Sequence, residues 1–235
     1  VGSILIHNGL RPKFIAGHSV GEISAYALAR SLSFEDGLKL VQFRATAMHE
    51  AGSIKSGSMA AVIGLNEESL QGHCANYTNG IVCVANYNSP NQAVISGDSI
   101  AIENISPELL KAGAIKVIKL NVSGAFHSPL MEPAKDKLDK YIQDVDISDA
   151  IFPVYSNVSA TPVTEKNKIS DSLVDQLVSP VLWYKSVENM ILDGIKTGIE
   201  IGPGKVLQGL AKRINSGLNM YGAETHQDIL NLGHV

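Results

Sequence analysis

An apolar run ends in Gly-x-Ser-x-Gly near the start of this chain, in the stretch Phe14-Ile-Ala-Gly-His-Ser-Val-Gly-Glu22. A helix-forming segment, residues 22–30, follows at once. A strand, a sharp turn and a helix in this order form the setting of a nucleophile elbow, which holds a serine at the tip of the turn. The pattern therefore predicts an α/β fold in which Ser19 is the candidate nucleophile.

The two glycines of this turn have a physical role. So tight a turn strains the serine backbone, and we expect no room for a Cβ at Gly17 or Gly21. The helix that follows directs its free N–H groups, Val20 first, at an oxyanion formed on attack by Ser19. Short motifs also arise by chance, so a glycine-flanked turn that merely contains serine is the alternative interpretation.

Composition narrows the class of protein. The 235 residues are 45% hydrophobic and 18% charged, which is typical of a globular protein and argues against disorder. A formal charge of -4 gives no global reason to expect nucleic-acid binding. Cys74 and Cys83 supply neither a disulfide framework nor a metal-binding set, and they fit a reducing cytoplasm. We find no signal peptide and no apolar run long enough for a membrane span.

The middle of the chain predicts a separate small domain. Helix 34–50, which Ser33 would cap, is followed by a Gly/Ser/Lys linker at 53–57. The order βαββαβ then follows and is typical of a ferredoxin-like arrangement. We therefore predict a small domain at 58–122, inserted into a large domain of residues 1–57 and 123–235. Its elements are strands 59–65, 81–87, 92–96 and 114–120, helices 67–77 and 100–112, the latter divided at Pro107, and a turn at 88–91.

The second half of the chain returns to the large domain through a Gly/Ser/Pro loop, residues 122–129, which contains His127. Residues 198–201 are typical of a buried parallel strand. The turn 202–205 lacks the Walker spacing, so we reject a phosphate loop there. Residues 217–235 show no pattern that we can interpret. The other predicted elements are strand 152–156 and helices 130–143, 169–178, 182–193 and 206–215.

Three residues can be combined on chemical grounds. A serine hydroxyl needs a base to take its proton, and His127 is the best-placed histidine for that role. The side chain of His18 should point away from its neighbour Ser19. The planar guanidinium of Arg44 would bind a carboxylate on the acyl group if its helix faces Ser19, although a solvated surface arginine is the commoner case.

Five blocks in order carry a family resemblance, which extends to about residue 216. They are residues 17–22, 42–44, 86–90, 124–128 and 200–205. Together they resemble the malonyl-CoA:acyl carrier protein transacylases of fatty acid biosynthesis. The resemblance implies an α/β-hydrolase-like large domain with a parallel sheet, and a ferredoxin-like small domain.

The resemblance also implies a ping-pong reaction, with malonyl-CoA as substrate, acyl carrier protein as partner and no bound cofactor. Ser19 would carry malonyl as an ester, His127 would be base and then acid, and the main-chain carbonyl of Gln176 would orient His127. Arg44 would hold the malonyl carboxylate. We expect a cytoplasmic monomer without nucleic-acid or membrane partners. Phe126 resembles malonyl-selective members, and Asn86 and Asn88 would line the cleft for the pantetheine arm.

One departure from the family stands out. Its members begin with a strand and a Gly-Gln-Gly-Ser-Gln loop whose glutamine supplies a second oxyanion donor, so we expect about seventy residues of the family pattern before Val1. A serine hydrolase or thioesterase, which would need an Asp or Glu as third member, stays open as an alternative. So does a catalytically silent domain that binds acyl carrier protein. Basic candidates for docking the carrier are Lys185, Lys205, Lys212 and Arg213.

Overall fold

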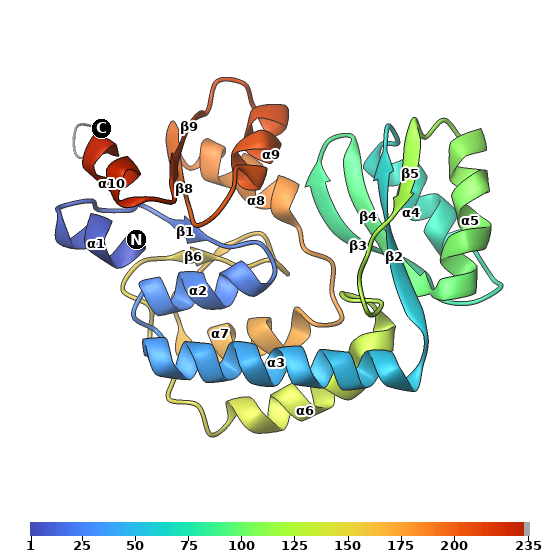
Figure 1. Ribbon diagram of the computed structural model, residues 1–235, viewed down its shortest axis with the longest axis horizontal. Coiled ribbons are helices and arrows are strands. Elements are labelled where there is room, and N and C mark those ends of the chain that lie inside the picture. Colours follow the sequence, from blue (N-terminus) through green and yellow to red (C-terminus); the bar gives the residue numbers. More distant parts are fainter. Residues whose placement is uncertain (233–235) are drawn as a thin grey trace.

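The computed structural model describes residues 1–232 and consists of two parts that lie side by side (Figure 1). The chain leaves the larger part at the end of α3 (Phe34–Ile54) and returns to it after β5 (Lys116–Lys119). The helices of the larger part are α1 (Gly2–His7), α2 (Val20–Leu28), α3, η1 (Pro129–Met131), α6 (Glu132–Ile142), α7 (Lys166–Asp175), α8 (Trp183–Leu192), α9 (Val206–Ile214) and α10 (His226–Leu232).

The smaller part has the order strand, helix, strand, strand, helix, strand. Its four strands pair antiparallel in the order β3-β4-β2-β5, and α4 and α5 pack on one face of the sheet (Figure 1). Buried Ile102, Ile105 and Leu109 recur on one side of α5, as an amphipathic helix requires. The elements are β2 (Gly57–Ile63), α4 (Glu67–Asn76), β3 (Val82–Ser89), β4 (Gln92–Asp98), α5 (Ser99–Lys111) and β5.

The strands of the larger part form two small sheets. Strand β1 (Ile15–Ala16) pairs in parallel with β6 (Val154–Tyr155), which pairs antiparallel with β7 (Pro162–Val163). Strand β8 (Thr197–Ile201) pairs in parallel with β9 (Asn219–Ala223). Within residues 1–232, β1 and β8 have no strand between them. The expected parallel sheet is therefore divided into two pieces.

A cavity of about 1610 Å³ lies between these two sheets. Both β1 and β8 line it, and so do apolar side chains of α1, α2, α8 and α9. The Gly17–Gly21 turn and Trp183 lie at its wall as well. The nucleophile turn is thus bordered by this cavity on one side and by the helical core on the other.

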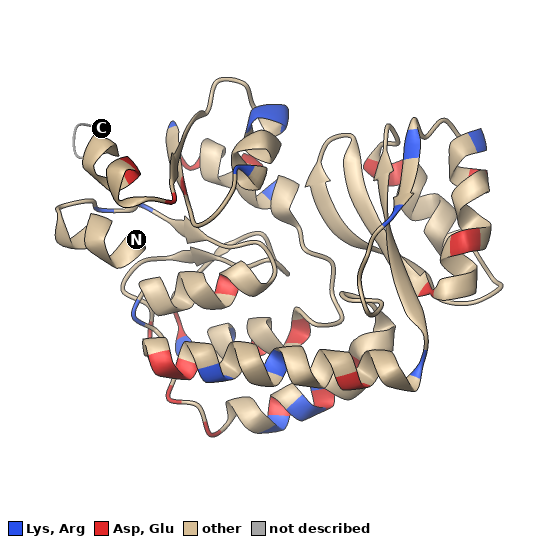
Figure 2. Cartoon of the chain, viewed as in Figure 1, with Lys and Arg blue, Asp and Glu red and all other residues tan. Residues whose placement is uncertain are grey.

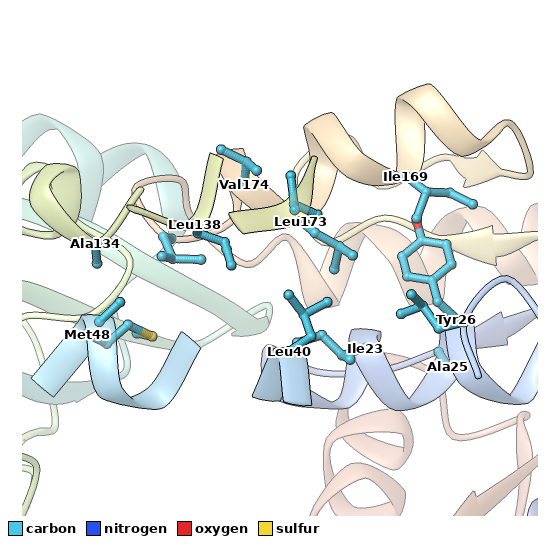
Figure 3. Close-up of a cluster of buried hydrophobic side chains, with 14 of the residues drawn as sticks. Ile23, Ala25, Tyr26, Leu40, Met48, Ala134, Leu138, Ile169, Leu173 and Val174 are labelled. Atoms are coloured by element: carbon cyan, nitrogen blue, oxygen red, sulfur yellow. The ribbon is translucent and has the colours of Figure 1, made fainter. Parts of the chain in front are cut away.

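The core of the larger part lies between α2, α3, α6 and α7 (Figure 3). Tyr26, Leu40, Leu138 and Ile169 are among its fully buried side chains. The buried positions of α3 recur at helical spacing, and Arg44 falls in the same stripe. The packing that buries α3 therefore turns this arginine inward.

Local chemistry explains where α3 begins. The side-chain oxygen of Ser33 accepts the backbone N–H of Asp36 at 3.0 Å, which satisfies one of the free donors of the first turn. The helix then continues to Ile54, so the predicted linker at 53–57 is reduced to residues 55 and 56.

Three other expectations about elements are wrong, and one segment without a prediction contains two elements. Strand β3 continues through Ser89, so the predicted turn at 88–91 contains only two residues. Pro107 lies inside a continuous α5, where buried neighbours outweigh one lost hydrogen bond. Strand β8 is partly exposed, because within residues 1–232 it pairs with β9 alone. Residues 217–232 contain β9 and α10, and the rest of that segment, 233–235, lies outside the described residues.

Candidate active site

Ser19 occupies a strained turn between β1 and α2. Its φ of 52° and ψ of -112° lie in a region that L-residues rarely adopt. A Cβ on Gly17 would lie 1.9 Å from the carbonyl oxygen of Gly21, so residue 17 must be glycine. The expectation for Gly21 is wrong, because within residues 1–232 no atom outside its chain neighbours and the nearby backbone of α2 lies within 4 Å of the position of its Cβ. Only one of the two glycines is required by space.

His127 joins Ser19 to the far end of α7. Its Nε2 lies 2.8 Å from Ser19 Oγ, and its Nδ1 lies 2.8 Å from the main-chain oxygen of Gln176. Because a carbonyl oxygen only accepts hydrogen bonds, Nδ1 must carry the proton. Nε2 is then free to accept the hydroxyl proton of Ser19. The structure thus brings together the three residues predicted to form the catalytic unit.

Arg44 reaches the same serine from α3. Its Nη2 donates to Ser19 Oγ at 3.1 Å and to Oε1 of Gln176 at 3.0 Å. The side chain is buried, and its Nε has no hydrogen-bond acceptor in the described part of the chain. A buried guanidinium with an unused donor is suited to a carboxylate, which accepts two parallel N–H groups.

Burial sets the charge state of the site. It lowers the pKa of His127 to about 4, and the positive charge of Arg44 acts in the same direction. Burial also lowers the pKa of Arg44 to about 10, while the charge of Glu22 opposes that shift. At neutral pH the site therefore holds a neutral imidazole beside a charged guanidinium.

The backbone N–H of Val20 is the first donor of α2. No acceptor for it occurs among residues 1–232, and Val20 is 45% exposed. An N–H at the positive end of a helix favours negative charge beside it. The N–H of Ser19 itself is not free, because it donates to Oδ1 of Asn157 at 2.7 Å.

A pocket of about 290 Å³ opens over these groups. Its apolar wall includes Met48 and Phe126, and its size suits a short acyl group. Phe126 packs both against the core of the larger part and against the sheet of the smaller part. The pocket is lined by Ser19, Arg44, Ala45, Met48, His49, Ser123, Phe126 and His127.

The two predicted asparagines lie on β3, and both are buried. Asn88 accepts from Nε2 of His18 at 2.8 Å, and the ring of His18 lies against that of Trp183. His18 is therefore bonded away from Ser19, as expected. Asn86 forms an isolated β-bridge with Val181, which ties the small sheet to the segment before α8.

Two buried polar residues at the site were missed by the sequence analysis. Asn157 follows β6, and its amide bonds both the N–H of Ser19 and the carbonyl of Gly17, each at 2.7 Å. Glu22 lies in the first turn of α2 and accepts from Nε2 of Gln176 at 2.5 Å. Asn157 follows a strand that is parallel to β1, and the carboxyl ends of parallel strands lie at the same edge of a sheet, so its position was a usable signal.

Other kinds of site find no support in the described residues. Within 1–232 we find no group of three or more His, Cys, Asp or Glu side chains able to hold a metal ion. No helix in this range combines the length and apolarity that crossing a bilayer requires. Cys74 and Cys83 are both free thiols.

Comparison with known proteins gives a consistent result. The family described as "Acyl transferase domain" matches residues 4–224. The malonyl CoA-acyl carrier protein transacylase of Bacillus subtilis is 45% identical to this chain. The matched region covers 88% of this chain and 66% of the length of the Bacillus subtilis protein. The Staphylococcus aureus (strain COL) protein of the same name is 40% identical over 94% of this chain and 72% of its own.

Solved structures agree with the sequence relatives. The malonyl CoA-acyl carrier protein transacylase of Coxiella burnetii superposes with a TM-score of 0.95 at 36% identity, covering 99% of this chain and 74% of that one. A malonyl-transacylase in complex with a type II PKS acyl-carrier protein superposes with a TM-score of 0.94 at 34% identity, covering 99% and 76%.

Proposed function

Because the chain belongs to the acyl transferase domain family, and within it to the malonyl-CoA:acyl carrier protein transacylases, we propose that it transfers malonyl from malonyl-CoA to the phosphopantetheine thiol of acyl carrier protein. Such a transfer supplies malonyl-acyl carrier protein for fatty acid elongation. The observation that carries the proposal is the contact of one serine with both a neutral histidine and a buried arginine.

The first half-reaction uses Ser19 as nucleophile. Its Oγ attacks the thioester carbonyl of malonyl-CoA while His127 Nε2 takes the hydroxyl proton. The N–H of Val20 supports the oxyanion. When the C–S bond breaks, the coenzyme A thiolate takes the proton from His127, which leaves malonyl on Ser19 as an ester.

The second half-reaction reverses these steps with a different thiol. The phosphopantetheine thiol of acyl carrier protein gives its proton to His127 and attacks the ester carbonyl. Breaking the C–O bond returns Ser19, which takes the proton back. Malonyl leaves as a thioester, and no water or cofactor enters the balance.

Arg44 selects the acyl group in this proposal. A malonyl carboxylate in the pocket would accept from Nη2, which now donates to Ser19, and from the unused Nε. A charge pair in so dry a place is strong, because water screens it little. Phe126 closes the apolar wall around the short acyl chain.

The main-chain oxygen of Gln176 takes the place that a carboxylate holds in many serine enzymes. A neutral acceptor stabilises the imidazolium less than a carboxylate does, in keeping with the low pKa of His127. Glu22 is near but accepts from the side chain of Gln176, not from the imidazole. The thioesterase alternative, which needs an Asp or Glu on the histidine, is therefore not favoured.

The finer architecture belongs to the same proposal. The strand order β3-β4-β2-β5 with both helices on one face supports a ferredoxin-like domain at 58–122. The elbow between β1 and α2 supports an α/β-hydrolase-like domain of residues 1–57 and 123–235. We further propose a cytoplasmic monomer with no resident cofactor, whose clefts near Asn86 and Asn88 admit the pantetheine arm.

The test follows the covalent ester through both half-reactions. The purified chain is mixed with malonyl-CoA, its intact mass is read, and the adduct is mapped by peptide mass spectrometry. We expect malonyl on Ser19 and its quantitative release as malonyl-acyl carrier protein when the carrier is added. Ser19→Ala is the control and should stay unlabelled. Release mainly to water would favour a hydrolase, and no adduct on folded protein would favour the silent carrier-binding domain.

A further inference from the structure

A continuous row of hydrogen bonds runs from α2 to the arginine of the site. Glu22 Oε2 accepts from Gln176 Nε2 at 2.5 Å. Gln176 Oε1 in turn accepts from Arg44 Nη2 at 3.0 Å, and the same Nη2 donates to Ser19 Oγ at 3.1 Å. The mechanism above uses only the main-chain oxygen of Gln176, so the side chain of this residue and Glu22 have no role in it yet.

Glu22 is unusual for an acidic residue. Its side chain is fully buried, and it forms no ion pair of 4 Å or less in the described part of the chain. Besides Gln176, it accepts from the N–H of Asn157 at 3.2 Å, and from Tyr26 and Ser172 at 3.5 and 3.4 Å. A buried carboxylate is costly, as its pKa of about 7 reflects. The cost of burying the carboxyl group of Glu22 suggests that this residue has a function at the site.

The side-chain amide of Gln176 has two chemically different ends, and Glu22 determines which of them faces Arg44. Gln176 can present either its oxygen or its NH₂ group to Arg44, and only the oxygen attracts a guanidinium. The Oε2 atom of Glu22 accepts from two N–H groups, one of which belongs to the NH₂ end of Gln176. The same NH₂ group also donates to the main-chain oxygen of Ser19, at the longer distance of 3.2 Å. With its NH₂ group bound in this way, the amide presents its oxygen to Arg44.

We propose that Glu22 and the side chain of Gln176 are positioning residues for Arg44, which hold its guanidinium beside Ser19 and so set the preference for acyl groups with a carboxylate. This inference rests on the proposed function. It separates two roles of Gln176, because the main chain orients the base whereas the side chain orients the arginine.

The test compares malonyl-CoA with acetyl-CoA. Single-turnover labelling of Ser19 by each donor is followed by intact mass, and the ratio of the two rates is the readout. Glu22→Met and Gln176→Met remove the side-chain contacts but keep the main-chain carbonyl for His127. Glu22→Gln is the conservative variant, since one amide oxygen can take both N–H groups that now meet Oε2, while its NH₂ faces the hydroxyls of Tyr26 and Ser172.

The ratio should fall about tenfold or more in both Met variants, because each loses a hydrogen bond in a row that ends on a charged group. Acetyl labelling should change much less. The ratio in the double variant should be no lower than in Gln176→Met alone, since both changes break the same row, although losing the contact of Glu22 with Asn157 can lower the labelling by both donors. Glu22→Gln should keep most of the preference, and Tyr26→Phe, which touches Glu22 without reaching Gln176, should keep all of it.

Loss of malonyl and acetyl labelling in equal proportion in the Met variants would overturn the inference, as would a Glu22→Gln variant as defective as Glu22→Met. If Glu22→Met does not fold, Gln176→Met and Glu22→Gln still decide the question. Wild type and Arg44→Ala are measured alongside. Absence of malonyl labelling in wild type would count against the proposed function, whereas a wild-type ratio in Gln176→Met with a lowered ratio in Arg44→Ala would reject only this inference.

Discussion

Ser19 Oγ has two partners that act on it in opposite ways. His127 Nε2 accepts its proton and so makes the oxygen more nucleophilic, while Arg44 Nη2 donates to it and occupies a lone pair. A substrate carboxylate that draws Arg44 away would free this lone pair. It would also remove part of the positive charge that lowers the pKa of His127. Binding of an acyl group with a carboxylate would thereby make His127 a stronger base for the attack by Ser19.

The low pKa of His127 predicts the pH dependence of acylation. Because His127 must be neutral to act as base and its pKa is about 4, kcat/KM for Ser19 acylation should stay nearly constant from pH 7 down to about 5. It should fall only as the pH passes through about 4. Stopped-flow or quenched acylation over pH 4–8 measures this. A decline centred near pH 6.5, the ordinary value for histidine, would contradict the prediction.

The same shift affects stability with a definite sign. A histidine whose pKa is lower in the folded state stabilises the fold above pH 6.5, and that contribution disappears as the pH falls through 6.5 toward 4. The full span corresponds to roughly 3 kcal/mol. We expect the difference in the free energy of unfolding between wild type and His127→Gln, measured in urea, to shrink by this order between pH 7 and pH 4. A pH-independent difference would rule the explanation out.

At the scale of elements, the turn between β1 and α2 determines where the nucleophile stands. Asn157 bonds both the N–H of Ser19 and the carbonyl of Gly17, so the strained turn is clamped on both sides. The end of β6 supplies that clamp, since β6 is parallel to β1. The segment after β6 thus holds the strained turn in its conformation.

The two glycines of the elbow provide a matched pair of variants. Gly17→Ala would force a Cβ to within 1.9 Å of the Gly21 oxygen, so we expect a loss of more than about 3 kcal/mol in stability and of nearly all Ser19 labelling. Among the described residues, the Cβ of Gly21→Ala meets nothing within 4 Å apart from its chain neighbours and the nearby backbone of α2, where alanine favours the helix by up to about 1 kcal/mol. Urea unfolding of both variants checks this. Equal damage by both would show that the turn is not held as described.

Much of the element order could be predicted because it depends on local patterns. The elbow, the Ser33 cap of α3 and the alternation in the small sheet all lie within short stretches of sequence. Strand β6 lies within the predicted strand 152–156, but β7 has only two residues and β9 contains Gly222, so neither β7 nor β9 carries a strong signal. Their pairing depends on distant partners.

The residues of the site also fall into those that the sequence indicates and those that it does not. Ser19, His127 and Arg44 carry chemistry that is recognisable from residue type and local context. Glu22 and Asn157 bind partners more than 130 positions away. The position of Asn157 after a predicted strand was a usable signal, but nothing near Glu22 in the sequence indicates its contact with Gln176. The resemblance to a family supplied Gln176 for its main chain, but not the second role of its side chain.

At the scale of the whole molecule, the pocket beside Ser19 is lined by residues of the larger part and lies next to the smaller part. Phe126 packs on both parts, and the bridge from Asn86 to Val181 joins the small sheet to the segment before α8. The exposed basic residues Lys185, Lys205, Lys212 and Arg213 lie on or beside α8 and α9. Figure 2 shows basic positions in blue on these helices. Arg213 also bonds Gln92 on the small sheet.

These basic residues predict where acyl carrier protein, an acidic partner, docks. Lys205→Glu and Arg213→Glu should each slow transfer from malonyl-Ser19 to the carrier several-fold at low salt, while acylation by malonyl-CoA stays near wild type. Lys140→Glu is the matched control, because α6 lies on the opposite side of the molecule (Figure 1). Quenched-flow measurement of the two half-reactions separates the effects. Equal loss in both half-reactions would exclude a docking role.

The most direct measurement is single-turnover labelling of Ser19 by malonyl-CoA and by acetyl-CoA in wild type and Arg44→Ala. Losing a buried charge pair costs about 3 kcal/mol or more, so malonyl labelling should fall about a hundredfold or more. Acetyl labelling should hold or rise, since Ser19 keeps its base and loses the donor on its lone pair. If malonyl labelling does not depend on Arg44, or if both donors fall alike, Arg44 does not select the acyl group and the account is wrong.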